Sequence, residues 1–278
     1  MASFPFSSRF HTTAYRFPNE NLILAITIVV ILLLIALTVP ATVCLSLVLV
    51  LGMLVISYFY SRSQHQVLLK QGQPVNQQTM PELSSLAGKT ANRLGVEPVE
   101  VFVIPNRELN AYTFGLSTPK TIVLNSSLFD VMDQDEIQFV LGHEMGHVQL
   151  GHTWLNSLVG GMAGIPSPPE IGLLLVLIFR WWNRACEYSA DRAGMLAVGN
   201  PRKAVSALVK LYTGIHNLSP ASLERALVSI ETQDDSLLNN LNELLATHPM
   251  IVRRIEQLQR YINTAEYRRL QSLVNQNG

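Results

Sequence analysis

The chain has 278 residues, and its 20 Lys and Arg residues balance its 20 Asp and Glu residues, so the formal net charge is zero. No run of Lys or Arg stands out, which argues against nucleic acid as a partner. The two cysteines, Cys44 and Cys186, are too few for a disulfide framework, and this is typical of a reducing compartment.

The first long element is apolar. From Leu22 to Phe59 the chain carries no charged residue. A single helix of that length would measure about 57 Å, nearly twice the hydrocarbon core of a bilayer, which is about 30 Å thick. Pro40 lies near the middle, and proline interrupts helices. We therefore expect a transmembrane helical hairpin within residues 21–60, with spans of roughly 22–38 and 42–60.

Two other interpretations are a buried helical pair in a soluble core and a cleaved signal peptide. Soluble cores rarely need so long an uncharged run, and no A-x-A-like site separates its two halves. Arg9 and Arg16 precede the hairpin, and Arg62 and Lys70 follow it. By the positive-inside rule, we expect both ends on the cytoplasmic side of a bacterial-type inner or plasma membrane.

The rest of the chain predicts one folded domain. Residues 1–20 are expected to be an N-terminal cytoplasmic segment, residues 61–80 a juxtamembrane linker, and residues 81–278 a mainly helical α+β domain with a small sheet. Alternation and turn residues predict a strand in 99–106 and two strands around a turn in 110–125. Apolar spacing predicts helices at 81–95, 171–199, 202–213, 220–231, 235–246, 250–261 and 264–274, and a further helix that starts near Asp133 in the stretch 133–158.

Residues 171–179, "IGLLLVLIF", are a short apolar run before Arg180. The run is too short to span a bilayer. With Trp181 and Trp182 directly after it, the run suits a membrane interface. A buried helix segment fits equally well, and the sequence does not separate the two.

The stretch "LGHEMGH", residues 141–147, has the spacing of metal ligands. Asp133 and Glu136 resemble a capping box, so the stretch lies inside a helix. Helical positions four apart are about 40° apart around the axis, so His143 and His147 can each give one nitrogen to a single ion. Glu144 lies about 100° round from His143. There it can hold and deprotonate a bound water without ligating the metal.

A catalytic zinc needs a third protein ligand and one open position. His152 lies about 140° round the helix from His147, so we expect it at the surface or beside a ligand rather than on the metal. Glu187, in "NRACEYSAD", is the better candidate. Asp191 follows on the same helical face, where it would accept the spare N–H of a ligating histidine. Such an E-x-x-x-D pair alone would usually be a solvated face, but here it follows HEMGH.

Four segments, in this order, resemble the HtpX-like zinc metallopeptidases, the family that also contains the CAAX prenyl endopeptidases. They are "NAYTFG" (110–115), "DEIQFVLGHEMGHVQLGH" (135–152), "NRACEYSADRAG" (183–194) and "THPMIVRRI" (247–255). The resemblance covers roughly residues 81–260. It implies a gluzincin-type peptidase domain that holds one zinc per chain on His143, His147 and Glu187. Glu144 would be the general base, and Asp191 would support a ligand.

The resemblance also implies roles outside the ligand set. His248 is expected to approach the metal, where it would stabilise the oxyanion or block the zinc at rest, and Arg254 is expected nearby. An exposed edge strand would bind an extended substrate through main-chain hydrogen bonds, which tolerates many side chains. The strand residues are Asn110, Ala111, Tyr112, Thr113, Phe114 and Gly115.

The sequence departs from both branches of the family. HtpX-type members usually have two further spans between the zinc helix and the third-ligand helix, where this chain has only the run 171–179. CAAX-type members have several more spans, so we do not expect a prenylated substrate. The flanks of HEMGH are also too polar for an intramembrane protease.

We therefore expect a membrane-anchored zinc endopeptidase of protein quality control. Its partners would be the lipid bilayer and unfolded or misfolded polypeptides, membrane proteins among them. The alternative is a zinc-stabilised membrane adaptor that binds unfolded segments without cleaving them. Glu144 argues against the adaptor, because metal binding alone does not need that carboxylate.

Overall fold

The computed structural model describes residues 14–38, 70–115, 119–155, 169–213 and 249–277, with isolated residues between 48 and 67. Its strands are β1 (Gln73–Pro74), β2 (Val99–Ile104), β3 (Ala111–Phe114) and β4 (Lys120–Asn125). Its helices are α1 (Glu20–Thr38), α3 (Pro81–Leu94), α4 (Leu128–Val131), α5 (Gln134–Gln149), α7 (Pro169–Val198), α8 (Pro201–Thr213), α11 (Pro249–Ile262) and α12 (Ala265–Asn277). The mainly helical α+β class is confirmed.

The strands form one mixed sheet in the order β1-β2-β4-β3. The register of β2 and β4 is parallel, from Val99 opposite Lys120 to Ile104 opposite Asn125. Strand β3 pairs antiparallel with β4 and lies at one end of the sheet. The strands expected in 99–106 and 110–125 are therefore confirmed, and β3 is an edge strand of the described sheet.

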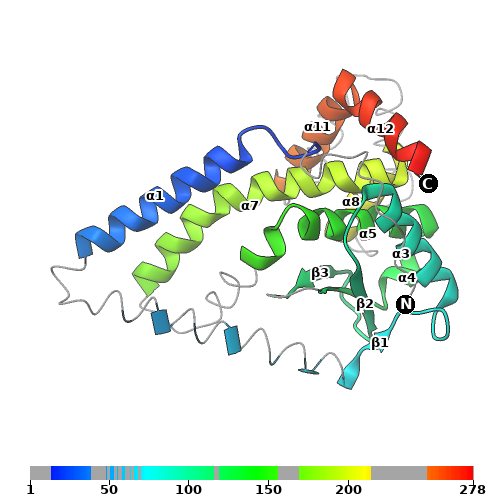
Figure 1. The fold of residues 1–278 in the computed structure, drawn as a ribbon, viewed down its shortest axis with the longest axis horizontal. Helices are drawn as coiled ribbons and strands as arrows, with labels where there is room; N and C mark the ends of the chain where they lie inside the picture. The colour runs from blue at the N-terminus through cyan, green and yellow to red at the C-terminus, as the bar shows by residue number, and fades with distance from the viewer. Residues whose placement is uncertain are drawn as a thin grey trace.

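The helices are arranged in layers on this sheet (Figure 1). Helix α5 lies between the sheet and α7, and α11 and α12 lie beyond α7.

The helices begin and end at the residues that the sequence signals indicate. The backbone N–H of Glu136 donates to Oδ1 of Asp133 at 3.1 Å and the N–H of Asp133 donates to Oε2 of Glu136 at 2.9 Å, which confirms the capping box. Gly95 ends α3 with a φ of 66°.

The C-terminal predictions fall partly outside the described residues. Helices α8, α11 and α12 confirm the helices expected at 202–213, 250–261 and 264–274. The two helices expected at 220–231 and 235–246 lie outside the described part of the chain, so they stay predictions.

Helices α5 and α7 touch through their backbones. An added Cβ on Gly142 would lie 2.4 Å from the Cβ of Ala197, and one on Gly146 would lie 2.6 Å from the Cβ of Ala193. Real Cβ atoms do not approach so closely, so only glycine fits at these two positions of α5. This pair of helices makes the most extensive contact between described elements.

Helix α1 covers the first expected membrane span and packs on the N-terminal half of α7 (Figure 1). A small apolar cluster forms this contact and includes Ile23, Phe179 and Trp182. Large apolar side chains elsewhere on α1 are exposed, namely Leu22, Ile26, Ile28, Val29, Leu32, Leu33 and Leu37. Within the described ranges, no helix is both long and apolar enough to cross a membrane. The second expected span, 42–60, lies almost entirely outside those ranges, so the hairpin stays a prediction.

Of residues 171–182, the structure describes the side chains from Phe179 onward, so the choice between a membrane interface and a buried helix stays open for the run before it. Trp182 is buried against α1, whereas the neighbouring Trp181 is half exposed. The helix therefore buries one face and leaves another open.

The segment before α1 is bound into the domain. Tyr15 is fully buried in the main core. The backbone N–H of Phe17 donates to the hydroxyl of Ser189 at 2.7 Å, and a guanidinium N–H of Arg16 donates to the carbonyl of Leu150 at 3.0 Å. The chain therefore enters α1 from a fixed position on α7 and on the end of α5.

We predict that Gly142→Ala destabilises the protein by about 1–3 kcal/mol, because the new methyl group forces α5 and α7 apart. Gly88→Ala is the matched control, since Gly88 lies in α3 and an added Cβ there meets nothing within 4 Å. That change should stabilise by about 0.5–1 kcal/mol through helix propensity. Urea unfolding of the full chain measures both, and equal effects would contradict the close helix contact.

Candidate metal centre

Three potential metal ligands converge from α5 and α7. Nε2 of His143 lies 3.3 Å from Nε2 of His147. The carboxylate of Glu187 lies 3.6 Å from the first of these atoms and 3.4 Å from the second. The two histidines are buried, whereas the Glu187 side chain is 32% exposed, so the group opens to solvent on one side. The structure thus brings together the three residues that the sequence indicates.

The donors fit a zinc ion. Nδ1 of His143 faces Oδ1 of Asp191 at 3.1 Å, so its proton lies on Nδ1 and its lone pair on Nε2. Nε2 of His143 therefore presents its electron pair to the space that it shares with Nε2 of His147 and the Glu187 carboxylate, an arrangement that a cation stabilises. Two imidazoles, one carboxylate and an open side match the protein ligands of catalytic zinc.

Glu144 is buried beside these donors without joining them. Burial raises the pKa of the Glu144 carboxyl, although the adjacent His143 and His147 lower it. A carboxylate with a raised pKa is a better proton acceptor near neutral pH. Its position in α5 matches that of a base next to a metal.

Asp191 and Glu187 are held by one arginine of α11. Arg254 donates to Asp191 from Nε at 2.8 Å and from a terminal nitrogen at 2.5 Å, and it pairs with Glu187 at 2.9 Å. Burial alone would raise the pKa of both carboxyl groups, but the guanidinium holds the pKa of Asp191 below its usual range and that of Glu187 well below it. Arg254 therefore lies where the sequence resemblance implies.

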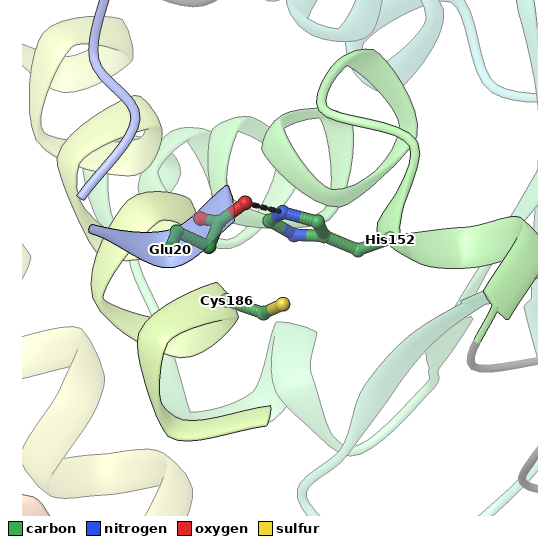
Figure 2. Close-up of side chains that lie close together, drawn as sticks. All are labelled: Glu20, His152 and Cys186. Atoms are coloured by element: carbon green, nitrogen blue, oxygen red, sulfur yellow. Dashed lines mark hydrogen bonds and ion pairs between the residues drawn. The ribbon is translucent and has the colours of Figure 1, made fainter. Parts of the chain in front are cut away.

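His152 is buried, so the interpretation that places it at the surface is wrong. Its Nδ1 lies 3.1 Å from Nδ1 of His147, and its Nε2 lies 3.0 Å from Oε1 of Glu20. The ring of Trp182 packs edge-on against it, and Glu20, the first residue of α1, lies on its other nitrogen (Figure 2). Burial lowers the pKa of His152 to about 4, so the ring is neutral near pH 7. Burial alone would raise the pKa of Glu20, but the hydrogen bond with His152 holds it below its usual range.

A cleft of about 360 Å³ joins the metal donors to the edge strand. Its lining includes the three donors, Glu144 and Arg254, together with Asn110, Ala111, Tyr112 and Thr113. Strand β3 thus forms one wall of the space beside the donors. Phe114 and Gly115, the last residues of the expected substrate strand, do not line this cleft.

One site residue predicted from the sequence lies outside the described residues, and two residues near the site were not predicted. His248 lies outside the described residues, directly before α11, so its role stays a prediction. Sequence reasoning used Arg16 only as a positive residue before the hairpin and assigned no role to Glu20. The side chains of these two residues form an ion pair. Their i,i+4 spacing next to the apolar run was the available signal.

Similarity to known proteins covers the same residues. The model of "Peptidase family M48" matches residues 76–167 and 169–262. Plastoglobule-localized metallopeptidase 48 of Arabidopsis thaliana is 28% identical over 215 residues, which is 72% of this chain and 62% of that protein. The chain thus spans less than two thirds of that relative.

Two microbial relatives are matched over more of their length. The protease HtpX homolog of Salinibacter ruber is 25% identical over 241 residues, which is 77% of this chain and 86% of that protein. The protease HtpX homolog of Pyrococcus abyssi is 25% identical over 246 residues, which is 75% and 82% of the two chains. The resemblance seen in the sequence motifs is confirmed.

We predict that Arg254→Met destabilises the protein by about 3–5 kcal/mol, because it leaves buried carboxylates without their cation. Arg253→Met is the matched control, since Arg253 is the exposed neighbour on α11. It should change stability by less than about 0.5 kcal/mol. Urea unfolding of the metal-free chain measures both, and a small effect of Arg254→Met would contradict a supporting role for this ion pair.

Proposed function

The chain belongs to peptidase family M48, a family of zinc metalloproteases, and on that premise we propose that it is a membrane-anchored zinc endopeptidase acting on unfolded or misfolded proteins, including membrane proteins. The observation that carries the proposal is the cleft in which the donors His143, His147 and Glu187 meet the buried Glu144 and an edge strand.

His143, His147 and Glu187 would hold one zinc ion per chain. When bound, the ion supplies a Lewis acid that polarises a peptide carbonyl and makes water a stronger acid. Asp191 orients the ring of His143, because its carboxylate accepts the Nδ1 proton. Arg254 in turn fixes the orientation of Asp191.

Glu144 would be the general base. Its buried carboxylate takes a proton from the attacking water and delivers it to the leaving amine. The raised pKa supports the first of these steps, because it makes the carboxylate a better proton acceptor. In an adaptor that only binds metal and unfolded segments, this carboxylate would have no chemical role.

Strand β3 would bind the substrate. An extended polypeptide that adds to the edge of the sheet lies along the cleft wall formed by residues 110–113, beside the metal donors. Main-chain hydrogen bonds require an extended segment but do not depend on the identity of most side chains. Such binding favours unfolded chains over folded ones.

His248 would act close to the metal. It directly precedes α11, the helix that carries Arg254 into the donor group. Its short distance along the chain from Arg254 supports a place near the metal. There it would stabilise the oxyanion or block the zinc at rest.

The apolar N-terminal segment would anchor the enzyme in the membrane. The exposed apolar side chains of α1 support this, because water-exposed apolar surface of that extent is unusual in soluble proteins. The positive flanks favour a cytoplasmic position for the peptidase domain. In that position the cleft would face the cytoplasm.

We predict that the chain stays in the membrane fraction after alkaline extraction and that its domain faces inward. Single cysteines introduced by Ser8→Cys, Lys70→Cys or Ser272→Cys in a Cys44→Ser chain should react with an impermeant maleimide only after cells are permeabilised. Reaction of the cysteine at position 272 in intact cells would contradict the cytoplasmic position. Release by alkali would contradict the anchor itself.

Glu144→Gln separates the peptidase from the adaptor. The amide keeps the size of the side chain and cannot accept the proton, so proteolysis of casein should fall by at least about a hundredfold. Zinc content and binding of unfolded casein should stay unchanged, because the ligands and the edge strand are untouched. If the purified, zinc-loaded wild type cleaves no faster than Glu144→Gln, the adaptor replaces the peptidase.

A further inference from the structure

A second line of buried polar groups runs behind His147, away from the cleft. It passes from His147 to His152 and then to Glu20, the first residue of α1. Figure 2 shows the hydrogen bond between Glu20 and His152, with Cys186 of α7 beside the pair. His152 and Glu20 are each 1% exposed, so water does not compete for these bonds.

Counting protons assigns a role to every nitrogen in this line. When Nε2 of His147 gives its lone pair to a metal, the single proton of the neutral ring lies on Nδ1. At 3.1 Å this N–H donates to Nδ1 of His152. The proton of the neutral His152 ring therefore lies on Nε2, from which it is donated to Oε1 of Glu20 at 3.0 Å. Each donor in the line meets one acceptor.

The carboxylate at the end is itself held in place. Arg16 and the hydroxyl of Ser189 both donate to Glu20, and Arg16 also donates to the carbonyl of Leu150 at the end of α5. The arrangement parallels that behind His143, where Asp191 accepts the ring proton and Arg254 holds Asp191. Both donor histidines are thus backed by a carboxylate paired with an arginine, one directly and one through a second histidine.

We propose that His152 and Glu20 are positioning residues for the metal centre, which fix the ring orientation and the tautomer of His147. This inference rests on the proposed zinc site. Groups that hydrogen-bond a ligating histidine typically change metal affinity by about 10–100-fold when they are removed. Through Glu20, the segment before the proposed membrane anchor becomes part of the support of the metal.

The same three buried side chains, Glu20, His152 and Cys186, also have the residue types of a second metal site, and their potential ligand atoms all lie within 4.8 Å of one another. The proton count argues against that use. With one metal on Nε2 of His147 and a second on Nε2 of His152, each neutral ring would carry its proton on Nδ1. The two Nδ1 atoms face each other and have room for only one proton, so one ring would have to become an imidazolate. Cys186 therefore packs beside the pair without binding a metal, and we expect one metal per chain.

The test measures zinc affinity and stoichiometry by chelator competition on the purified full chain. We expect His152→Ala to weaken zinc binding by about 10–100-fold. His152→Asn should recover part of that loss, because its amide oxygen can accept the Nδ1 proton of His147. Glu20→Gln should weaken binding less than His152→Ala, because it removes the charge and keeps an oxygen for His152.

Two control variants test the neighbourhood of the line rather than the line itself. Thr27→Val removes a buried hydroxyl that donates to the carbonyl of Ile23 within α1, and zinc affinity should not change. Cys186→Ala should keep one zinc at unchanged affinity. Two zinc ions in the wild type and one in Cys186→Ala would overturn the proposal in favour of a second metal site.

Other outcomes separate this proposal from the function on which it rests. Wild-type affinity in folded His152→Ala would overturn the positioning role and leave the zinc site intact. A Glu187→Ala chain that binds zinc as the wild type does would instead contradict the zinc site itself. If the His152 variants do not fold, nitrogen NMR of the zinc-loaded wild type decides, since the proposal requires His147 to be protonated at Nδ1 and His152 at Nε2, and the reverse on His152 overturns it.

Discussion

The close contact between α5 and α7 is the constraint on which the centre depends. Two of the potential ligands lie on one helix and the third on the other, so the distance between the helix axes sets the distance between His147 and Glu187. Gly142 and Gly146 allow that distance because they place no side chain between the backbones. The same turns of α5 therefore carry both the histidines that meet Glu187 and the glycines that contact Ala193 and Ala197. The chemistry of the cleft therefore depends on the close packing of these two helices.

Electrostatics then orients what packing brings together. Buried charges are costly unless they are paired and hydrogen-bonded, and each carboxylate behind a donor histidine has an arginine partner. Asp191 meets His143 directly, whereas Glu20 reaches His147 through His152. These contacts hold the rings in one orientation before any metal arrives. A site prepared in this way loses little conformational freedom on binding.

The cleft and the N-terminal segment lie on different sides of the same donors. Strand β3 borders the open side, where Glu187 is partly exposed and a polypeptide has room to bind. Glu20, the first residue of α1, is buried on the other side, behind His147 and His152. In the proposed function, the substrate binds on the open side of the donors, and the buried side joins the donors to α1.

The sequence by itself determined the local chemistry. Helix geometry relates His143 to His147 and places Glu144 beside them, and the capping box at Asp133 depends only on neighbouring residues. Short-range patterns likewise predicted the bounds of α3, β2 and α8. The third ligand was accessible as well, because Glu187 and Asp191 repeat a helical spacing and accompany recognised motifs.

Only the tertiary structure decided how distant segments meet. Helical angles left His152 either at the surface or beside a ligand, and its burial depends on Trp182 and on Glu20, which is 132 positions away along the chain. The close approach of Gly146 to Ala193 was equally invisible, because periodicity gives the face of a helix but not its partner. The physical reason is that backbone geometry fixes relations within a few residues, whereas contacts between elements depend on the packing of the whole domain.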